Sequence, residues 1–326
     1  MHKLLILSSL RQALDISFLN GAVDGRIVSS GGANATRTNS TGSIVAATTP
    51  RIDYDPVSLA CTGLLIEPAG TNLFAGASID GASLATQNVG LTAAAHTLSF
   101  YGTGTVTLSG AATAGPLVGS AVYPTRSTLT FTPSAGSVTF TVSGSVQYAQ
   151  LETGSIATSF NPSGAARTAD SVSIESANFL PWFDSSGAGT LIVEFISRAS
   201  PLVAPGRPVV SLDDAATSYI DARVRPTGKA GMAVVSAGVS QADTASAASY
   251  TAGGVHKLAV AYAANSFASC LDGETCATDE AGTVPACSMM HIGSDVGVTN
   301  FFAGWVRRIR YWRKRLPNST LQRLTA

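Results

Sequence analysis

Short runs in which apolar and polar residues alternate constrain the fold of this 326-residue chain more than any other feature. Residues 97–101, 104–109, 127–132 and 137–142 each place an apolar side chain at every second position. A period of two turns one face of a strand inward and the other outward, whereas an amphipathic helix needs a period near 3.6. Glycine, proline and serine between the runs are typical of turns that join antiparallel strands. The pattern predicts a small β-sandwich over residues 76–152.

The C-terminal half carries a second set of strand-like runs, which predicts a second sandwich over residues 174–326. Residues 153–173, which contain Gly154, Pro162 and Gly164, are predicted to be a linker. The strand-like runs are residues 189–196, 207–212, 218–224, 255–262, 267–271, 289–293 and 302–312, followed by a short helix over 318–324. The fold class is therefore all-β.

The first 75 residues differ from both predicted sandwiches. Turn-forming clusters at residues 29–36 and 38–43 separate short strand-like pieces at residues 14–19, 42–47 and 63–67. Such a segment buries too little to order alone, and its backbone groups need partners. We therefore expect an irregular attachment segment over residues 1–75 that pairs with other copies of the chain.

Composition excludes several classes of partner. Twenty basic residues balance twenty acidic ones, so the basic surplus that nucleic-acid binding requires is absent from the chain as a whole. The sequence has no apolar run near the roughly 20 residues that span a bilayer. The apolar start at residues 1–10 is interrupted by Arg11 and lacks an A-x-A cleavage site, so we expect no signal peptide and no membrane insertion.

Four cysteines are too few for a disulfide scaffold in a chain of this length, and they lack the spacing of a zinc site. A two-residue turn at Asp272-Gly273 would set Cys270 opposite Thr275, whereas a three-residue loop would set Cys270 opposite Cys276, where a bridge could form. Buried thiols are the favoured interpretation. The cysteines are Cys61, Cys270, Cys276 and Cys287.

No catalytic constellation is visible in the sequence. Glycoside hydrolysis needs two carboxyl groups about 5–10 Å apart, and the run at residues 189–196 offers Glu194 alone. Asp213 and Asp214 are adjacent and point to opposite faces of an extended strand. His256 and His291 lie in strand-like runs and are expected to be structural, and the sequence has no G-x-S-x-G motif. We expect a protein that is not an enzyme.

Two ordered blocks carry a family resemblance. Residues 36–42 (TRTNSTG), 49–56 (TPRIDYDP) and 63–73 (GLLIEPAGTNL) closely resemble a block of bacteriophage tail-fibre and head-spike proteins. Residues 150–162 (QLETGSIATSFNP) and 167–170 (RTAD) are similar to the connector of the same family. The chain departs from the family at Ile52, where a Phe is usual, and at Ala69-Gly70, where Gln-Arg is usual.

From residue 174 onward the chain is similar to the concanavalin A-like, laminin-G-like jelly rolls that such proteins carry. The supporting motifs are Gly189-Thr-Leu, His256-Lys-Leu, Leu271-Asp-Gly-Glu, Ile292-Gly and residues 304–312 with Leu316 and Leu321. Over residues 76–148 the resemblance is limited to strand rhythm, where the family usually has a carbohydrate-binding-module-like sandwich.

The resemblance implies a structural subunit of a virion appendage, a fibre or a spike, that contributes to recognition of host-surface polysaccharide. It also implies a homo-oligomer, with a trimer as the first expectation, other virion structural proteins as partners, and assembly in the cytoplasm of the host bacterium. Two alternatives stay open, a purely architectural or decoration protein and a polysaccharide-degrading tailspike. The location on the tail or on the head also stays open.

The polar residues of the first block are expected to pin irregular backbone rather than to bind a ligand. These structural residues are Arg37, Arg51, Asp53, Tyr54, Asp55, Glu67 and Asn72.

A glycan site is expected in the C-terminal sandwich, because exposed aromatic rings stack on sugars while nearby polar groups bind hydroxyls. The candidates are Trp305, Trp182, Asp295 and Asn300. The closing strand is predicted to turn Val306, Ile309, Tyr311 and Leu316 inward, with a bulge, and Trp305 outward.

Two further expectations concern charged residues. The basic stretch at residues 307–315 is expected to cover apolar surface or to pair with a neighbouring subunit. No cofactor is predicted, although the loops that carry Asp272, Asp279, Glu280 and Asp295 could hold Ca²⁺. No EF-hand-like spacing supports such a site.

Overall fold

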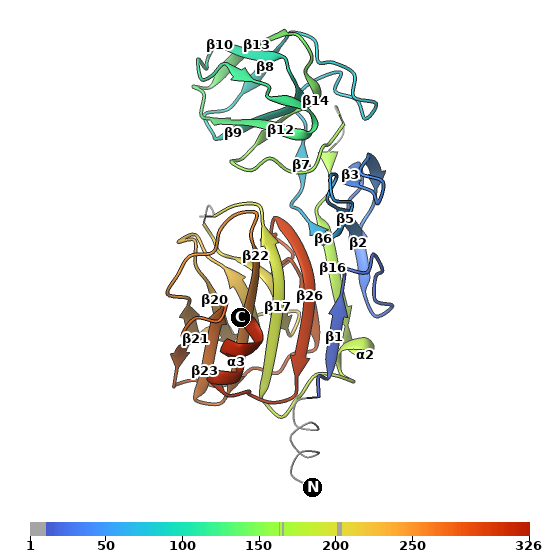
Figure 1. Cartoon of the computed structure of the whole chain (residues 1–326). Coiled ribbons are helices and arrows are strands. Elements are labelled where there is room, and N and C mark those ends of the chain that lie inside the picture. The colour runs from blue at the N-terminus through green and yellow to red at the C-terminus, as the bar shows by residue number, and fades with distance from the viewer. Residues whose placement is uncertain (1–10, 163, 165, 201–203) are drawn as a thin grey trace. The chain divides into compact units, whose positions relative to one another are not determined.

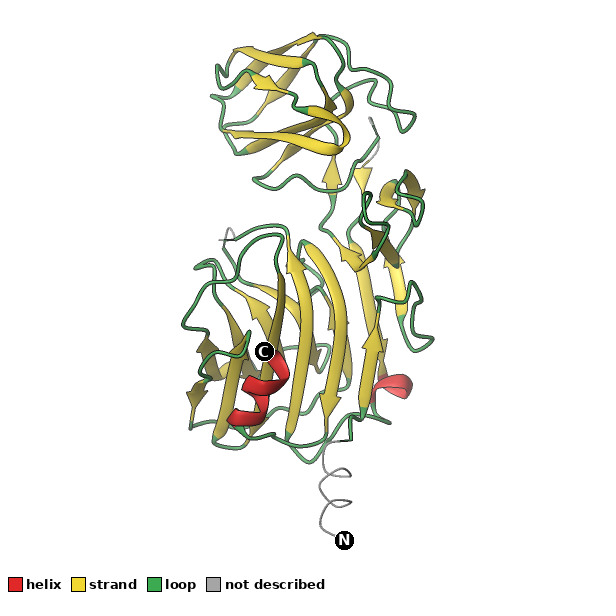
Figure 2. Cartoon of the chain, in the orientation of Figure 1, coloured by secondary structure: helices red, strands yellow, loops and turns green. Residues whose placement is uncertain are grey.

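A computed structural model describes residues 11–162, 164, 166–200 and 204–326, and its fold is all-β as predicted (Figures 1 and 2). The start at residues 1–10, for which we expect no signal peptide, lies outside the described residues. The chain forms two compact units. The larger unit comprises Met1–Ser30, Cys61–Pro68 and Asp170–Ala326, and the smaller unit comprises Gly31–Ala60 and Ala69–Ala169.

Two antiparallel sheets build the larger unit. The strands of the first sheet follow the order β24-β23-β22-β17-β26-β6, and β1 also pairs with β26. These strands are β24 (Ala277–Asp279), β23 (Ser266–Leu271), β22 (Val255–Ala263), β17 (Gly189–Ser197), β26 (Gly304–Trp312), β6 (Cys61–Ile66) and β1 (Leu14–Ser17). The second sheet, in spatial order, contains β2 (Val28–Gly31), β16 (Asp170–Glu175), β25 (Met289–Ile292), β18 (Arg207–Asp213), β19 (Tyr219–Val224), β20 (Ala230–Ser236) and β21 (Val239–Ala245).

The two sheets pack face to face as a jelly-roll sandwich. Alternate side chains of the central strand β17, Leu191, Val193 and Phe195, are fully buried and face the second sheet, whose Leu212 and Ile220 are equally buried. Full burial of each such side chain contributes about 1.5–3 kcal/mol. The alternation of the C-terminal runs therefore builds this core.

The closing strand β26 contains the predicted bulge. Glu194 pairs with Arg308 and Phe195 pairs with Val306, so Arg307 is the extra residue. Val306 is fully buried in the core, as are Ile309 and Tyr311, which confirms their predicted direction.

Leu316 is buried, but the prediction that it faces the sandwich core is wrong. Leu316 packs on the outer face of the first sheet, where helix α3 (Asn318–Thr325) covers an apolar patch. The patch recruits side chains of β17, β22, β23 and β26 that point away from the second sheet. Its buried members are Ile192, Ala259, Ala261, Ala268, Cys270, Trp312, Leu316 and Leu321.

Cys270 and Cys276 form a disulfide with a Cα–Cα distance of 4.3 Å, so the expectation of buried thiols is wrong for this pair. Ser269 of β23 pairs with Ala277 of β24, and this register sets the two cysteines opposite each other. The turn between the strands is closed by a hydrogen bond from the N–H of Glu274 to the carbonyl oxygen of Leu271. Asp272 and Gly273 in this loop have φ values of 47° and 78°, a conformation that glycine adopts without strain.

The smaller unit contains a second, small sandwich, as the alternation predicts. One sheet has the order β11-β10-β13-β8 and the other β12-β9-β14. Leu98 and Phe100 of β9 and Val138 and Phe140 of β13 are fully buried between the two sheets. The strands are β11 (Leu117–Val118), β10 (Thr105–Gly110), β13 (Gly136–Ser143), β8 (Gln87–Leu91), β12 (Ala121–Phe131), β9 (His96–Gly102) and β14 (Gln147–Thr153).

Short elements complete both units. The smaller unit also contains a hairpin and a two-stranded pairing, and helix α2 lies in the larger unit. These elements are β3 (Ala35–Thr38), which pairs with β4 (Ile44–Ala47), then β5 (Arg51–Tyr54), β7 (Gly70–Thr71), which pairs with β15 (Ala166–Arg167), and α2 (Ser176–Phe179). Within the described residues, no helix is long and apolar enough to span a membrane.

The first 75 residues, expected as one attachment segment, are divided between the two units. β1 and β6 extend the first sheet of the larger unit, and β2 extends its second sheet. The expectation that this segment needs other copies for its backbone pairing is therefore wrong for these strands, because β26 and β16 supply their partners.

Candidate functional site

The first block of the family resemblance forms a buried hydrogen-bond network in the smaller unit. Arg51 is fully buried and donates to the carbonyl oxygen of Thr36 at 2.8 Å and to Oγ of Ser159 at 2.9 Å. Ser159 belongs to the connector block, so the network joins the two blocks. Arg37 donates to the carbonyl oxygen of Ile52.

Asn72 uses its whole side chain inside the protein. Its amide nitrogen donates to the carbonyl oxygens of Ala149 and Asn161, and its amide oxygen accepts from the N–H groups of Phe74 and Leu151. An Asn side chain offers two donors and one acceptor oxygen, so little capacity is left for a ligand.

Three other residues that were predicted to be structural are Asp53, Tyr54 and Glu67. Asp53 accepts from the N–H of Thr38 at 2.6 Å. Tyr54, in β5, is half-buried. Glu67, which lies in the larger unit, is fully buried and pairs with Arg198. Its N–H donates to the side-chain carboxylate of Asp170, and its carbonyl oxygen accepts from the N–H of Asp170.

Asp55 shapes a rigid tip in the smaller unit. Its Oδ1 accepts from the N–H groups of Val57 and Ser58, and its backbone pairs with Ala60 and Leu59. The loop holds Val57 at 76% and Leu59 at 47% exposure, with Leu59 at a φ of 58°. A bulky residue rarely adopts this backbone region, so the exposed apolar tip is a specific arrangement.

Trp182 does not offer a ring to a sugar, and the expectation that it does is wrong. The residue is only 3% exposed and its indole N–H donates to the carbonyl oxygen of Asn178. Its ring packs against Phe179 at 4.6 Å and Tyr311 at 5.3 Å between ring centroids. The entry turn of the domain is folded into the core by these aromatic contacts.

Trp305 is half-buried on β26, and the guanidinium group of Arg198 lies over its ring. The guanidinium carbon of Arg198 lies 4.3 Å from the ring centroid, and Arg198 in turn pairs with Glu67 at 3.3 Å. The indole face that Arg198 covers is not open for a sugar to stack on.

Asp295 and Asn300 are joined to each other. Asp295 accepts from the N–H groups of Thr299 and Asn300, and Asn300 accepts from Arg207 at 2.9 Å. Burial alone would raise the pKa of Asp295, but these N–H groups outweigh burial and lower the pKa. The loop consumes most of the hydrogen-bonding capacity that a glycan would need.

Two buried carboxyl groups lie close together on the second sheet. Asp213 accepts from Nδ1 of His291 at 2.7 Å, and Asp221 pairs with Arg223. Asp213 and Asp221 are 0% and 1% exposed. Burial raises the pKa of Asp221, against the opposing effect of Arg223.

The two residues lie on neighbouring strands, since the register sets Ser211 of β18, two positions before Asp213, opposite Asp221 of β19. Each carboxyl group is occupied by a basic partner and closed off from solvent. The two carboxyl groups belong to a buried hydrogen-bond network, in which His291 has the structural place that the sequence predicts.

The loops that were considered for Ca²⁺ use their carboxyl groups internally. Asp272 accepts from His256 at 2.6 Å and from the N–H of Lys257, and Asp279 accepts from the N–H of Ala281. In the part of the chain that the structure describes, no three His, Cys, Asp or Glu side chains gather in a way that could hold a metal.

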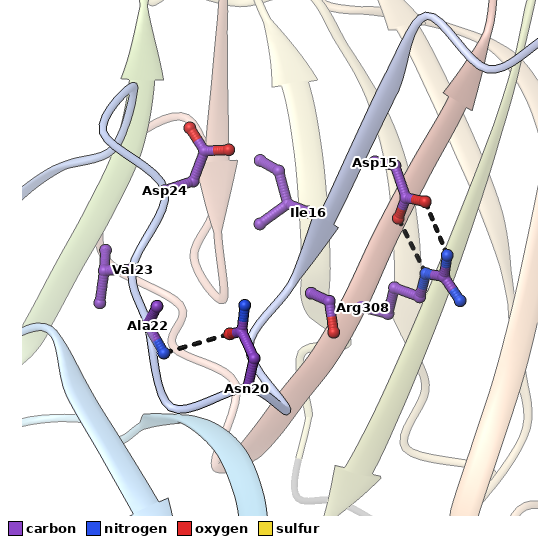
Figure 3. A pocket seen from close by; sticks show the side chains of 8 residues that line it. Asp15, Ile16, Asn20, Ala22, Val23, Asp24 and Arg308 are labelled. Atoms are coloured by element: carbon purple, nitrogen blue, oxygen red, sulfur yellow. Dashed lines mark hydrogen bonds and ion pairs between the residues drawn. The ribbon is translucent and has the colours of Figure 1, made fainter.

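A pocket of about 420 Å³ lies beside β1 in the larger unit (Figure 3). Strand β1 contributes one side of the pocket, the loop that follows β1 contributes another, and Arg308 comes from β26. The lining residues are Asp15, Ile16, Ser17, Asn20, Ala22, Val23, Asp24 and Arg308.

The loop at the pocket is shaped by its own side chains. Oδ1 of Asn20 accepts from the N–H of Ala22 at 3.1 Å, and Oδ1 of Asp24 accepts from the N–H of Arg26 at 3.0 Å. Asn and Asp favour such turns because they bond to the backbone two residues further on. These local bonds fix the loop beside β1.

The charged groups at the pocket are paired. Arg308 makes a bidentate pair with Asp15 at 2.8 and 2.6 Å, which raises the pKa of Arg308. Asp24 makes a bidentate pair with Arg26, which lowers the pKa of Asp24. Each of the two carboxylates that line the pocket, Asp15 and Asp24, therefore has an arginine partner, Arg308 within the lining and Arg26 beside it.

Hydrogen-bonding capacity remains on both sides of the pocket. Among the described residues, Nη1 of Arg308 and Nδ2 of Asn20 have no hydrogen-bond partner. The side chains of Asp15 and Arg308 are 37% and 40% exposed, so their open sites face solvent. Free donors and half-exposed carboxylate acceptors beside the aliphatic side chains of Ile16, Ala22 and Val23 suit a small polyhydroxylated molecule.

No local sequence pattern marks this pocket. Asp15 and Arg308 are separated by 293 positions, and they meet because β1 pairs with β26. Asn20 and Asp24 are recognisable in the sequence as turn-forming residues. Their proximity to Arg308 of β26 is not.

No family model matches the chain, and no curated protein matches it in sequence. Among solved structures, the chain is similar to the CBM40 of the Ruminococcus gnavus IT-sialidase bound to α2,3-sialyllactose, with 14% identity and a TM-score of 0.37 over 43% of this chain and 83% of that one. It is also similar to domain 4 of AbnA, a GH43 arabinanase of Geobacillus stearothermophilus, in complex with arabinotriose, with 12% identity and a TM-score of 0.38 over 48% and 73%.

A third similar structure is the heptameric SAP-like pentraxin of Limulus polyphemus, with 11% identity and a TM-score of 0.34 over 43% of this chain and 70% of that one. Likeness at this level says nothing about which ligand this chain binds.

Proposed function

We propose that this chain is a structural, non-enzymatic subunit of a bacteriophage appendage that binds a neutral glycan on the host surface. The pocket at β1 carries the glycan part of the proposal. It combines a ligand-sized cavity, half-exposed carboxylates that each have an arginine partner, and donors on Arg308 and Asn20 that have no hydrogen-bond partner among the described residues. Sugar hydroxyl groups both donate and accept, so they match this mixed lining.

The predicted affinity is weak. The pocket lining offers aliphatic contacts from Ala22 and Val23 but no aromatic ring, and each net hydrogen bond contributes about 0.5–1.5 kcal/mol. A dissociation constant on the order of 1 mM for one site follows from a few such bonds. Several linked copies would raise the apparent affinity by about 10²- to 10⁴-fold, which favours an oligomer.

The virion part of the proposal is supported by the smaller unit. The two resemblance blocks make one network around Arg51, and the same block holds Val57 and Leu59 out in solvent. Rigid, exposed apolar side chains are typical of surfaces that contact another protein. We therefore propose that this tip contacts a further copy of the chain or another virion protein, with a trimer as the first expectation.

Two observations weigh against the alternative that the chain is a polysaccharide-degrading tailspike. The buried carboxyl groups Asp213 and Asp221 have basic partners, and Glu194 pairs with Arg307 at 2.7 Å. Release of oligosaccharides from a host polysaccharide by the purified chain would overturn the non-enzymatic assignment.

The test of the glycan assignment is an array of bacterial-surface saccharides probed with the full chain at high salt, where binding that depends only on charge is screened. We expect retention on neutral saccharides in preference to anionic ones. Retention on anionic saccharides alone, or on none, would contradict the proposal and favour a purely architectural protein.

A further inference from the structure

The C-terminal part of the chain concentrates positive charge that the balanced total conceals. Residues 296–326 contain no Asp or Glu, yet they hold seven of the 20 Lys and Arg residues. A local excess of one sign creates a field that the net charge of the whole chain does not reveal. The seven residues are Arg307, Arg308, Arg310, Arg313, Lys314, Arg315 and Arg323.

Carboxylates neutralise two of these cations. Arg307 pairs with Glu194 at 2.7 Å and Arg308 pairs with Asp15 at 2.6 Å. Arg310 donates to the carbonyl oxygen of Leu324 near the end of α3 instead. Burial lowers the pKa of Arg310, and the neighbouring charge of Arg308 lowers it further. The strand therefore contains more positive charge than its carboxylates balance.

Three consecutive cations, Arg313, Lys314 and Arg315, follow the last strand, and we name them the cationic segment. Arg313 donates to the carbonyl oxygens of Pro181 and Trp182, and Arg315 donates to that of Leu316. Carbonyl oxygens satisfy N–H donors but do not cancel a charge. Among the described residues, no carboxylate lies within ion-pair distance of the cationic segment.

The backbone of the cationic segment is fixed. Oγ1 of the buried Thr190 donates to the carbonyl oxygen of Lys314 at 2.8 Å and accepts from the N–H of Leu316 at 2.9 Å. The segment lies between the end of β26, a strand of the first sheet, and the start of α3, which packs on the outer face of that sheet (Figure 1). A preformed site loses less entropy on binding than a flexible tail does.

We propose that the cationic segment binds a phosphodiester-linked polymer. Guanidinium groups bond bidentately to phosphate, and burial lowers the pKa of Arg315, so an added anion compensates a partly desolvated charge. Nucleic acid is disfavoured, because the adjacent rings of Tyr311, Trp312 and Trp182 are all buried and offer no platform for bases. None of the three cations lines the pocket, so this site is independent of the neutral-glycan proposal.

The experiment measures binding of the full chain to poly(glycerol phosphate), long-chain inorganic polyphosphate, single-stranded DNA, dextran sulfate and neutral dextran. With three phosphates neutralised, affinity for poly(glycerol phosphate) should fall by about 20- to 40-fold between 50 and 200 mM salt. The triple variant R313Q/K314Q/R315Q should lose at least tenfold at 50 mM salt. Glutamine keeps hydrogen-bonding capacity at each position but removes the charge.

The matched control is R26Q/R225Q/R307Q, which removes three cations that already have carboxylate partners. It should bind poly(glycerol phosphate) like the wild type. If the triple variant unfolds, the single variant K314E replaces it, since no side-chain bond of Lys314 appears among the described residues, and it should weaken binding at least threefold.

Three results would overturn the proposal. The first is equal affinity of the wild type and the charge-removed variants for poly(glycerol phosphate). The second is tighter binding to single-stranded DNA, which would indicate a nucleic-acid site. The third is equal binding to dextran sulfate, which would show that charge rather than phosphate is recognised. Loss of neutral-saccharide binding in the triple variant would not follow from this proposal, because the pocket is untouched.

Discussion

The Arg51 network of the smaller unit and the pocket of the larger unit are built from the same polar groups in opposite surroundings. Arg51 is fully buried and bonded to Thr36 and Ser159. Arg308 is bonded to one partner, Asp15, and is 40% exposed with one nitrogen open. A buried polar group whose hydrogen bonds are all made within the protein stabilises the fold. An exposed group that makes only some of its hydrogen bonds within the protein can exchange bound water for a ligand.

The comparison predicts two classes of variant. Substitutions in the Arg51 network should lower the free energy of unfolding and leave the ligand affinity of the folded protein unchanged. Substitutions in the pocket should lower ligand affinity and leave the free energy of unfolding unchanged.

The largest effect is expected from Arg51→Ala. The substitution removes the donor shared by the buried carbonyl oxygen of Thr36 and the half-buried Oγ of Ser159. A buried acceptor that loses its donor costs about 1–3 kcal/mol, so the free energy of unfolding should fall by about 3 kcal/mol. Urea denaturation measures this change. Arg37→Ala is the control, because Arg37 is half-buried and its loss should cost about 1 kcal/mol. Equal losses in the two variants would contradict the distinction between saturated and exposed groups.

The disulfide should come next. Replacing Cys270 and Cys276 by Ser removes a short-loop crosslink from the unfolded chain, which should lower stability by about 2 kcal/mol. The measurement is thermal unfolding with and without a reductant. The reductant should shift the wild type toward the variant and leave the double variant unchanged. A wild type that does not respond to reduction would indicate that the two thiols are not bridged.

A smaller effect is expected at the Asp295 loop. The pKa of Asp295 is lowered in the folded protein, so its carboxylate contributes stability that is present above the unfolded pKa and lost as pH falls through the folded pKa. Asp295→Asn should therefore be less stable than the wild type at pH 7, and the difference should shrink below about pH 4. Thermal unfolding across pH 3–7 measures it. A difference that is constant over this range would refute the assignment.

The smallest effect on stability is expected at the apolar tip. Val57→Asp with Leu59→Asp changes exposed side chains, so the free energy of unfolding should change by less than about 0.5 kcal/mol. Self-association, measured by light scattering, should weaken if the tip is a subunit contact. Val239→Asp, at another exposed valine, is the control. Unchanged association of the tip variant would contradict a contact between copies of the chain at the tip.

Much of the fold could be predicted because the period-two pattern is local. The predicted runs at residues 97–101 and 104–109 correspond to β9 and β10, and the predicted run at 302–312 corresponds to β26 with its bulge. The strands β20 and β21 were not predicted. Their sequences, AGMAVVS and VSQADTA, are rich in alanine and lack a distinct alternation.

The site could not be predicted, because it depends on contacts between distant segments. Trp182 looks like an exposed turn residue in sequence, but Tyr311 and Phe179 bury it. Asp15 lies in the segment that was predicted to pair with other copies of the chain, yet its strand β1 pairs with β26 of the same chain. Sequence periodicity sets which face of a strand is buried, but not which strand lies beside it.

The central claim is that the pocket at β1 binds a neutral glycan, and calorimetric titration of pocket variants tests it most directly. The wild type, Asn20→Ala, Arg308→Ala and Arg307→Ala would be titrated with the neutral saccharide that the wild type retains on an array. Arg307 is the matched control, because it lies next to Arg308 on β26 and has an equivalent ion pair outside the pocket. We predict at least a tenfold loss of affinity for Asn20→Ala and Arg308→Ala, with Arg307→Ala unchanged and all four proteins folded; equal affinity of the four proteins would contradict the account.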